Sequence, residues 1–328
     1  MVSSKQVAEM AGVSISTVSR VFSNPSLVNK KTLEKVLKIA EELNYVPDIN
    51  ARALKLNKSH IIGVIISDIS NPFYLQILKG IMSYSEIFEN NYRFYITFSN
   101  EDKKIELASL RSLVSSQVDY VVFTPVDHQN KNLESFLVDN NLPALQLFRH
   151  AYDGMDSITI DDEQGTYLAT KELLENNHKR ILLIDLEVPT PTGRDSGYIK
   201  AYNEYSINVD EKLIKKISFH CDIKTEVKKI LSETSCTAII PSTSIISDAV
   251  FEYLKEHNLK IKEDISIISY DDSEACKILN VTAITQPMNQ IVESFMSIFI
   301  EKSYNTRAEN RHIKLQPHII YRDSIKKL

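Results

Sequence analysis

The stretch that decides the amino-terminal fold is VAEMAGVSISTVSRV, residues 7–21. Its apolar residues recur at helical spacing, which predicts a short helix over 5–11 with Ser4 as its cap. Gly12 has no side chain to oppose the left-handed backbone that commonly ends a helix. The pattern therefore predicts a first helix of about two turns that stops at Gly12.

A second helix is expected directly after this turn. Ser14 is placed to cap a helix over 15–22, and only two residues separate it from the first helix. A connection this short brings two helices together at a steep angle, the geometry of a helix-turn-helix. A third apolar stretch predicts a helix over 30–43 with Asn29 as its cap. Residues 1–46 are thus expected to form a small all-α helix-turn-helix head.

Charge is unevenly distributed along the 328-residue chain. The net charge is −5, but residues 1–60 hold nine lysine and arginine residues against five aspartate and glutamate residues. A basic head on an acidic body concentrates the attraction for phosphate at one end of the chain. A chance fluctuation within a short segment is the alternative interpretation.

The second helix carries residue types that read DNA. Ile15, Ser16 and Thr17 are expected to point outward, with Arg20 one turn further along. An arginine can bind guanine bidentately in the major groove, and hydroxyl groups can bind phosphates or base edges. On residue types alone, a solvated helix face remains the alternative.

The first sixty residues resemble the lactose repressor/galactose repressor family of bacterial transcriptional regulators. The resemblance rests on residues 7–21 and continues through 28–36 and 43–47. It implies that Ile15 and Ser16 vary with the operator sequence and that Arg20 contacts bases. It further implies that the neighbouring hydroxyl residues serve phosphates or the turn: Ser14, Thr17 and Ser19.

Residues 47–58 resemble the hinge helix of the same family. Pro47 ends the third helix, and the segment after it is too short for an isolated helix to be stable in water. The family's hinge orders only on DNA, where two copies press a leucine into the minor groove, and Leu54 holds that position. Unstacking the bases costs a few kcal/mol. Without the resemblance, Leu54 would be a packing residue.

The full set of DNA-binding candidates is Ser4, Ser14, Ile15, Ser16, Thr17, Ser19, Arg20, Asn29, Tyr45, Asn50, Ala51, Arg52 and Leu54.

From His60 onward, apolar strands alternate with amphipathic helices. Strands are expected at 61–66, 92–98, 120–124, 142–148, from 158, and at 180–185, 238–241 and 265–270. The helices between them are expected at about 72–88, 101–116, 164–176, 196–205 and 246–257. This alternation predicts parallel sheets that are covered on both faces. Two doubly wound halves of this kind place a ligand cleft between them, at the carboxyl ends of their strands.

The sequence offers no chemistry for an enzyme. Its seven glycines build neither a dinucleotide-binding fingerprint nor a phosphate loop, and no catalytic triad or paired-carboxylate spacing stands out. Cys221, Cys236 and Cys276 are scattered, which fits a reduced cytosol rather than a disulfide or zinc framework. No apolar run reaches about 18 residues, and no signal-peptide profile is present. We therefore expect a cytoplasmic, nucleoid-associated protein with no membrane partner, cofactor or metal.

The rest of the chain resembles the same family and its periplasmic sugar-binding relatives. The matching stretches are 61–65, 70–74, 161–165, 193–198, 270–272 and 315–324. They imply an α/β periplasmic-binding-protein-like core, 59–328, of two doubly wound parallel-sheet subdomains. The N-subdomain would hold about 59–157 and 288–313, and the C-subdomain about 158–287 and 314–328.

The same resemblance supplies candidates for an effector site. Arg194 and Asp271 hold positions that grip effector hydroxyls, where an arginine and a carboxylate form charge-assisted hydrogen bonds. Phe73 and Phe219 could offer apolar faces to a sugar ring. Arg149 and Gln286 are additional candidates. A surface ion pair is the alternative for Arg194, and a core position is the alternative for Phe219.

Two departures from the family pattern bear on the ligand. Phe148 stands where the family usually has an aspartate, and Thr243-Ser244 stand where it usually has Asn-Asp. Either the ligand is not an ordinary free monosaccharide, or the pocket is weak or vestigial. The hydroxyls of Thr243 and Ser244, together with Arg149 and Arg194, could suit a sugar phosphate.

The leading hypothesis is a homodimeric repressor of carbohydrate-utilisation genes. Two heads would bind the halves of a pseudo-palindromic double-stranded operator. A sugar or sugar phosphate in the cleft would control operator affinity, by no more than its differential affinity for the two states of the core. One alternative is a regulator with a protein co-regulator or a vestigial pocket. Another is a sugar-binding protein without regulation.

Overall fold

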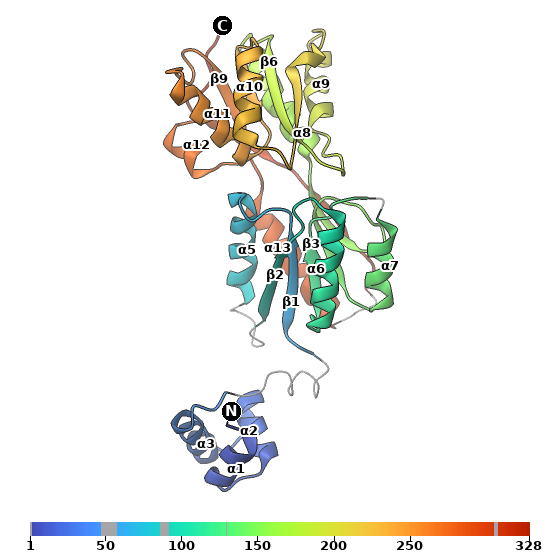
Figure 1. Ribbon diagram of the computed structural model, residues 1–328, viewed down its shortest axis with the longest axis vertical. Coiled ribbons are helices and arrows are strands. Elements are labelled where there is room, and N and C mark those ends of the chain that lie inside the picture. The colour runs from blue at the N-terminus through green and yellow to red at the C-terminus, as the bar shows by residue number, and fades with distance from the viewer. Residues whose placement is uncertain (1, 47–57, 86–91, 129, 305–307) are drawn as a thin grey trace. The chain divides into compact units, whose positions relative to one another are not determined.

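The computed structural model describes residues 2–46, 58–85, 92–128, 130–304 and 308–328 (Figure 1). The chain divides into two units, Met1–Ser59 and His60–Leu328. The hinge candidates Asn50, Ala51, Arg52 and Leu54 lie outside the described residues.

The first unit is a three-helix head. Its elements are α1 (Ser4–Ala11), α2 (Ile15–Ser23), a 3-10 turn (Pro25–Leu27) and α3 (Lys30–Glu42). Its small core is built from the apolar stripes of all three helices, namely Val7, Ala8, Ala11, Val18, Val21, Val36 and Ala40. The predicted helix-turn-helix head is therefore confirmed.

The caps of these helices agree with the sequence in all but one case. Gly12 adopts the left-handed conformation with φ 65°, and Ser14 and Asn29 cap the next two helices. The cap of α1 is Ser3 rather than Ser4. The Ser3 hydroxyl accepts from the Gln6 backbone N–H, and the Gln6 side chain accepts from the Ser3 N–H at 2.8 Å. This reciprocal pair satisfies two helix donors at once, so the helix begins one residue earlier than predicted.

The N-subdomain of the second unit is built on a parallel six-stranded sheet with the order β11-β5-β4-β3-β1-β2. Helices α5 and α13 pack on one face of the sheet, and α6 and α7 on the other. The strands are β1 (Ile61–Ile66), β2 (Arg93–Phe98), β3 (Tyr120–Phe123), β4 (Ala144–Phe148), β5 (Asp156–Ile160) and β11 (His312–Leu315). The helices are α5 (Pro72–Ser85), α6 (Lys103–Ser115), α7 (Lys131–Asp139) and α13 (Met288–Tyr304).

The C-subdomain repeats this architecture with the order β12-β10-β9-β8-β6-β7, in which only β12 pairs antiparallel. Helices α8 and α9 cover one face, and α10 and α11 the other. The strands are β6 (Ile181–Glu187), β7 (Ile214–Ser218), β8 (Ala238–Pro241), β9 (Ser266–Tyr270), β10 (Thr282–Thr285) and β12 (His318–Ile320). The helices are α8 (Asp162–Glu175), α9 (Arg194–Glu204), a 3-10 turn (Glu211–Leu213), α10 (Ile223–Glu233), α11 (Ser244–Glu256) and α12 (Glu274–Ile278).

The chain crosses between the sheets after β5, after β10 and after β11. The boundaries inferred from sequence, near 157 and 313, fall inside β5 and β11. Strand β5 stays in the first sheet to Ile160 because Ile158 and Ile160 both pack in the N-subdomain core. The subdomains therefore exchange chain a few residues later than the sequence suggested.

The repeat of strand order extends to one turn geometry. Phe148 ends β4 and has φ 67°, and Asp271 directly follows β9, the corresponding strand, and has φ 65°. Aspartate tolerates this left-handed conformation, whereas for a bulky side chain it costs roughly 1–2 kcal/mol. The strained backbone at Phe148 indicates that the surrounding structure holds its side chain at this place despite the energetic cost.

Candidate functional site

Helix α2 presents an outward face with no packing role. Ile15 is 50% exposed, and Ser16, Ser19 and Arg20 are exposed beside it, while Val18 and Val21 on the opposite side are buried. The Ser14 hydroxyl lies 2.7 Å from that of Ser16 and 2.8 Å from that of Thr17. A rigid, core-backed helix thus displays an arginine and a row of hydroxyl groups, as a helix that enters the major groove must.

Three further DNA-binding candidates also stabilise the head. Asn29 accepts the Lys31 backbone N–H at 2.9 Å. The Tyr45 ring packs against Phe22 with 5.7 Å between ring centroids. Ser4 is half-buried in the first turn of α1.

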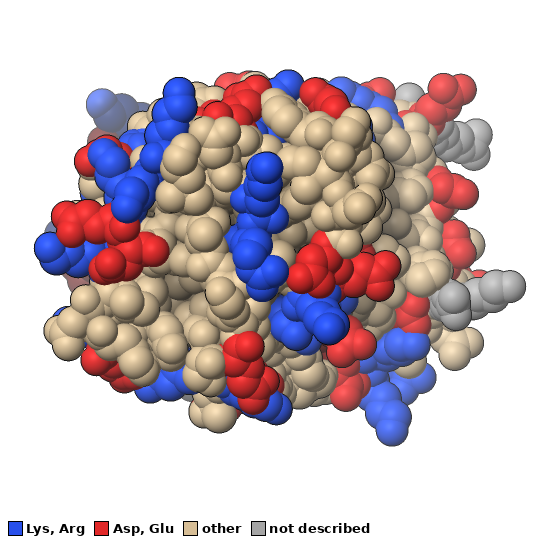
Figure 2. Space-filling view, turned by 90° about the horizontal axis from the view of Figure 1, so that it is seen from above, with Lys and Arg blue, Asp and Glu red and all other residues tan. Residues whose placement is uncertain are grey.

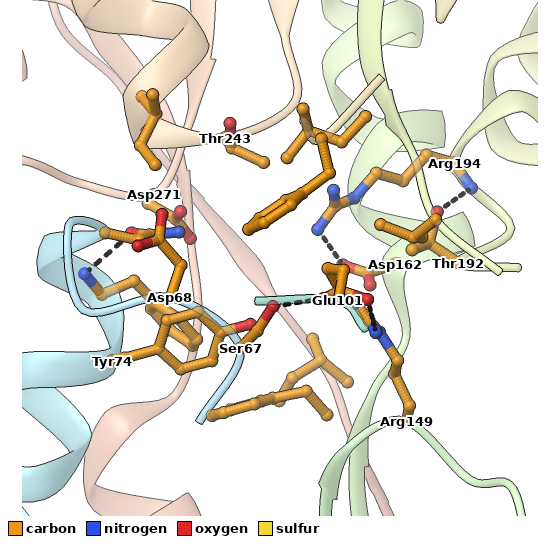
Figure 3. Close-up of a pocket in the computed structure, with 18 of the residues that line it drawn as sticks. Ser67, Asp68, Tyr74, Glu101, Arg149, Asp162, Thr192, Arg194, Thr243 and Asp271 are labelled. Carbon is orange, nitrogen blue, oxygen red and sulfur yellow. Dashed lines mark hydrogen bonds and ion pairs between the residues drawn. The ribbon is translucent and has the colours of Figure 1, made fainter. Parts of the chain in front are cut away.

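A cavity lies between the two subdomains (Figure 3). Because the sheets are doubly wound, the carboxyl ends of their strands and the first turns of α5, α8, α9 and α11 all face this cleft. Most of the effector candidates line it, namely Phe73, Arg149, Arg194, Phe219, Thr243, Asp271 and Gln286. Phe219 belongs to no buried core cluster among the described residues.

Arg194 is held in the cleft by carboxylates and an aromatic ring. It follows Gly193, whose φ of 81° opens α9, and its side chain is only 12% exposed. One terminal nitrogen lies 3.3 Å from Asp162 and the other 3.3 Å from Asp185. Its Nε is buried and has no partner in the described structure. This geometry rules out the surface ion pair and leaves the Nε–H of Arg194 without a partner among the described residues.

Tyr270 helps to position Arg194 through both its ring and its hydroxyl. The Arg194 guanidinium lies over the Tyr270 ring, and the Tyr270 hydroxyl donates to Asp162 at 2.7 Å. A side chain at Gly165 would collide with that hydroxyl, so only glycine lets the ring lie against α8. Burial raises the pKa of Tyr270 well above its usual value, so the hydroxyl stays a donor. The motifs at 161–165, 193–198 and 270–272 thus converge on one arginine.

Arg149 is bound by residues of its own subdomain. Its two terminal nitrogens each bind a Glu101 oxygen at 2.8 Å, and one also donates to the Pro125 carbonyl at 3.0 Å. Glu101 is 2% exposed and also accepts from the Ser67 hydroxyl. A bidentate pair of this kind is strong and directional. Arg149 is therefore not a free cation for a ligand phosphate.

Phe148 contributes to an aromatic wall on the N-subdomain side. Its ring centroid lies 4.8 Å from that of Phe73 and 5.8 Å from that of Tyr74. Burial raises the pKa of Tyr74 to about 12. The departure from the family's aspartate thus replaces a polar contact by an apolar face.

Asp271 and Gln286 form the polar counterpart on the C-subdomain side. The Gln286 amide donates to an Asp271 carboxylate oxygen at 2.8 Å. Burial raises the pKa of Asp271 to about 6. The carbonyl oxygen of Gln286 is buried and unpartnered within the described part of the chain.

Ser244 lines the adjoining pocket beside Asp271 and Gln286 rather than the main cavity. Its hydroxyl donates to Asn71 of the other subdomain at 3.0 Å, and Thr190 donates across the cleft to the Val126 carbonyl at 3.2 Å. Thr243 lines the cavity while its hydroxyl caps α11 through the Ile246 N–H. Ser244 therefore joins the two subdomains.

Several cleft residues were not predicted from the sequence. Asp162 lies within a recognised motif and could have been found there, as could Tyr74. Glu101 and Thr192 lie in loops without a distinguishing pattern. The remaining lining residues are Ser67, Asp68, Asn71, Phe148, Ile160, Leu186, Val188 and Ile245.

One face of the second unit can be followed in Figure 2. On the face in Figure 2, basic and acidic side chains are interspersed and neither kind gathers into a patch. Within the described ranges, no cluster of histidine, cysteine, aspartate or glutamate could hold a metal ion. Among the helices that the structure describes, none is long and apolar enough to span a membrane.

Comparisons with known proteins agree with both units. The model for bacterial regulatory proteins of the lacI family matches residues 5–48, and the model for the periplasmic binding protein-like domain matches residues 170–325. The HTH-type transcriptional repressor PurR of Vibrio atlanticus (strain LGP32) is 29% identical over 335 residues, covering 100% of both chains.

Two solved structures share the fold. The lac repressor dimer bound to operator and the anti-inducer ONPF superposes with a TM-score of 0.80 at 24% identity, covering 98% of each chain. The complex of the transcriptional regulator CelR with cellobiose superposes with a TM-score of 0.69 at 22% identity, covering 99% of this chain and 100% of the other.

The relatives are transcriptional repressors, which confirms the prediction that the chain is not an enzyme. The head, the two-subdomain core and the matched families agree along the chain. The chain thus carries the DNA-binding domain of the lacI family and a periplasmic-binding-protein-like domain, and it is a DNA-binding transcriptional repressor.

Proposed function

We propose that this repressor binds a pseudo-palindromic operator as a homodimer and that a small unphosphorylated sugar in the cleft controls its operator affinity. The genes under its control would serve carbohydrate utilisation. The observation that carries this proposal is the cavity between the subdomains, into which the first turns of several helices direct polar side chains.

The exposed face of α2 supports the operator part of the proposal. Arg20 has the reach for a bidentate contact to guanine, and Ile15 and Ser16 stand where a neighbouring base would be read. One head would cover one half-site, and a two-fold symmetric dimer would cover two.

The composition of the cleft supports a sugar. Aromatic rings on one side can pack against the apolar face of a sugar ring, while Arg194, Asp271 and Gln286 offer hydrogen bonds on the other. The CelR regulator, which shares this fold, was solved with cellobiose.

The ion pairs in the cleft argue against a phosphorylated ligand. Arg149 is bound by Glu101, and Arg194 is shared between Asp162 and Asp185. A phosphate would have to displace carboxylates that already satisfy these guanidinium groups.

The operator part is tested by selecting duplexes from a randomised pool and measuring binding by fluorescence anisotropy. We expect a palindromic consensus and an affinity that falls steeply with salt. Removal of residues 1–58 should abolish the binding. Specific binding that survives this removal would refute the proposal.

The effector part is tested by thermal-shift screening of sugars against their phosphorylated forms. Any hit is then added to the operator-binding assay. We expect unphosphorylated sugars to stabilise the protein and to change operator affinity. Stabilisation by sugar phosphates alone, or binding without any effect on operator affinity, would contradict the proposal.

A further inference from the structure

The charges that line the cleft are unbalanced. Four carboxylates line it, from Asp68, Glu101, Asp162 and Asp271, against two guanidinium groups, from Arg149 and Arg194. Both guanidinium groups bind carboxylates of the protein itself, Arg149 with Glu101 and Arg194 with Asp162 and Asp185. Across the described residues, no lysine or arginine forms an ion pair with Asp68 or Asp271. Figure 3 shows these two aspartates on one side of the cavity and the two arginines on the other.

Asp271 has a neutral partner where a cation would fit. The Gln286 amide nitrogen donates to it at 2.8 Å, which leaves the Gln286 carbonyl oxygen as a second acceptor at the same place. Gln286 is only 8% exposed, and this oxygen has no hydrogen-bond partner in the described structure. Buried polar atoms are almost always paired, so the unpartnered oxygen indicates a missing donor.

The electrostatic surroundings of Asp271 point the same way. Burial raises the pKa of the Asp271 carboxyl to about 6. Repulsion from Asp162 also raises this pKa, whereas attraction to Arg194 lowers it. The carboxylate is therefore charged at neutral pH but incompletely compensated. A ligand cation beside it would supply the compensation that the protein does not.

The number of donors separates the chemical classes that could fill this place. A hydroxyl group has one proton to donate, whereas a protonated primary amine has three and no acceptor. Phe73 lines both the main cavity and the adjoining pocket that contains Asp271 and Gln286. Its ring face can attract a cation but not an anion.

We infer that the effector carries a protonated amine, which binds between Asp271, the Gln286 carbonyl oxygen and the Phe73 ring. An amino sugar is the class of ligand that combines this group with the ring and hydroxyls that the rest of the cleft accepts. The inference rests on the proposed function, since it names the chemistry of the same effector.

The test compares ligands that share one sugar ring and differ in a single substituent and its charge. Isothermal titration at pH 7.5 measures the binding of glucosamine, glucose, N-acetylglucosamine and glucose 6-phosphate to the full chain, together with the corresponding galactose and mannose sets. We expect at least one amine to bind tenfold or more tightly than its parent sugar and its N-acetyl form. Its affinity should fall between pH 7 and pH 5, as Asp271 becomes protonated.

Two variants locate the amine. Asp271→Asn keeps the size of the side chain and should remove the preference for the amine over its parent sugar. Asp68→Asn removes the other unpaired carboxylate of the cleft and should retain the preference. Loss of the preference in Asp68→Asn but not in Asp271→Asn would overturn the assignment.

The outcomes also separate this inference from the proposed function. If a parent or N-acetylated sugar binds as tightly as the amine and changes operator affinity, the amine inference is wrong and the proposed function stands. If no sugar of any kind changes operator affinity, the proposed function itself fails.

Discussion

The guanidinium carbon of Arg194 lies 4.6 Å from the centre of the Tyr270 ring, and the same tyrosine donates its hydroxyl to Asp162 at 2.7 Å. Asp162 in turn binds Arg194 at 3.3 Å. Each member of this group is therefore positioned by the other two. The arrangement fixes the position of the Arg194 guanidinium in the cleft.

Tyr270→Phe should remove the hydrogen bond to Asp162 while keeping the ring under Arg194. A hydrogen bond to a charged group contributes about 1.5–3 kcal/mol, so we expect a loss of about 2 kcal/mol in the free energy of unfolding. Effector affinity should fall as Asp162 and Arg194 lose their fixed geometry. Urea denaturation and calorimetric titration measure the two effects.

Tyr198→Phe is the matched control for this change, because the Tyr198 hydroxyl donates to the neutral Ile181 carbonyl at 2.7 Å, outside the cleft. We expect a loss of about 1 kcal/mol and unchanged effector affinity. Equal effects of the two substitutions on effector binding would contradict the positioning role of Tyr270.

Phe148→Ala should destabilise the protein by about 2 kcal/mol, less than the roughly 3–5 kcal/mol usual for a fully buried phenylalanine, because Phe148 is half-buried. The aromatic wall with Phe73 and Tyr74 would be lost, while an alanine relieves little of the left-handed strain. Phe219→Ala is the control, since Phe219 lines the same cleft but joins no core cluster of the described chain. For Phe219→Ala we expect a loss of less than about 1 kcal/mol. A similar loss for both substitutions would show that the packing of Phe148 against Phe73 and Tyr74 adds no stability.

Glu106→Gln should reduce the pH dependence of stability. Glu106 is fully buried on α6, where it accepts the Val126 N–H at 2.9 Å, and burial raises its pKa to about 7. The folded state therefore holds a proton that the unfolded state releases, and stability falls as pH rises between about 4.5 and 7. The loss amounts to at most about 3 kcal/mol. Urea midpoints from pH 5 to pH 8 should decline in the parent and stay flatter in the variant; parallel curves would refute the assignment.

Arg20→Ala should weaken binding to the selected operator by about 1–3 kcal/mol, the usual worth of a bidentate base contact, and relax the preference at one base pair. The control is Lys38→Ala, since Lys38 lies exposed on α3 beside Glu42 at 3.9 Å. Anisotropy titrations at two salt concentrations separate a base contact from a phosphate contact. A uniform loss over all sequences with a smaller salt slope would assign Arg20 to the backbone instead.

The sequence predicted those parts of the fold in which local pattern and tertiary packing agree. The alternation of strands and helices gave the doubly wound core because β1 and its neighbours are nearly continuous apolar runs. Strand β7 was missed because IKKIS carries lysines and lies at a sheet edge. Helix α10 follows it in an equally polar stretch. Such elements depend on their neighbours rather than on their own composition.

The site shows the same division. Arg194 and Asp271 stand in short motifs that a resemblance can carry over, and the structure brings both to the cleft. Glu101 was expected to begin a helix, yet it lies before α6 and closes on Arg149, 48 residues further along the chain. No local pattern reports a partner at that distance. The neutralisation of Arg149, which decides against a phosphate, was therefore beyond the reach of the sequence.

The shared turn after β4 and β9 also has a consequence for how selectivity could diversify. Phe148 at the end of β4 and Asp271 directly after β9 both have a left-handed backbone, their strands hold corresponding places in the two sheets, and both line the same cavity. The same backbone conformation thus presents an apolar side chain from the N-subdomain and an acidic side chain from the C-subdomain. Substituting the side chains at these two positions would change which ligand the cleft selects while the fold is kept. This pair is therefore the natural starting point for engineering new ligand responses.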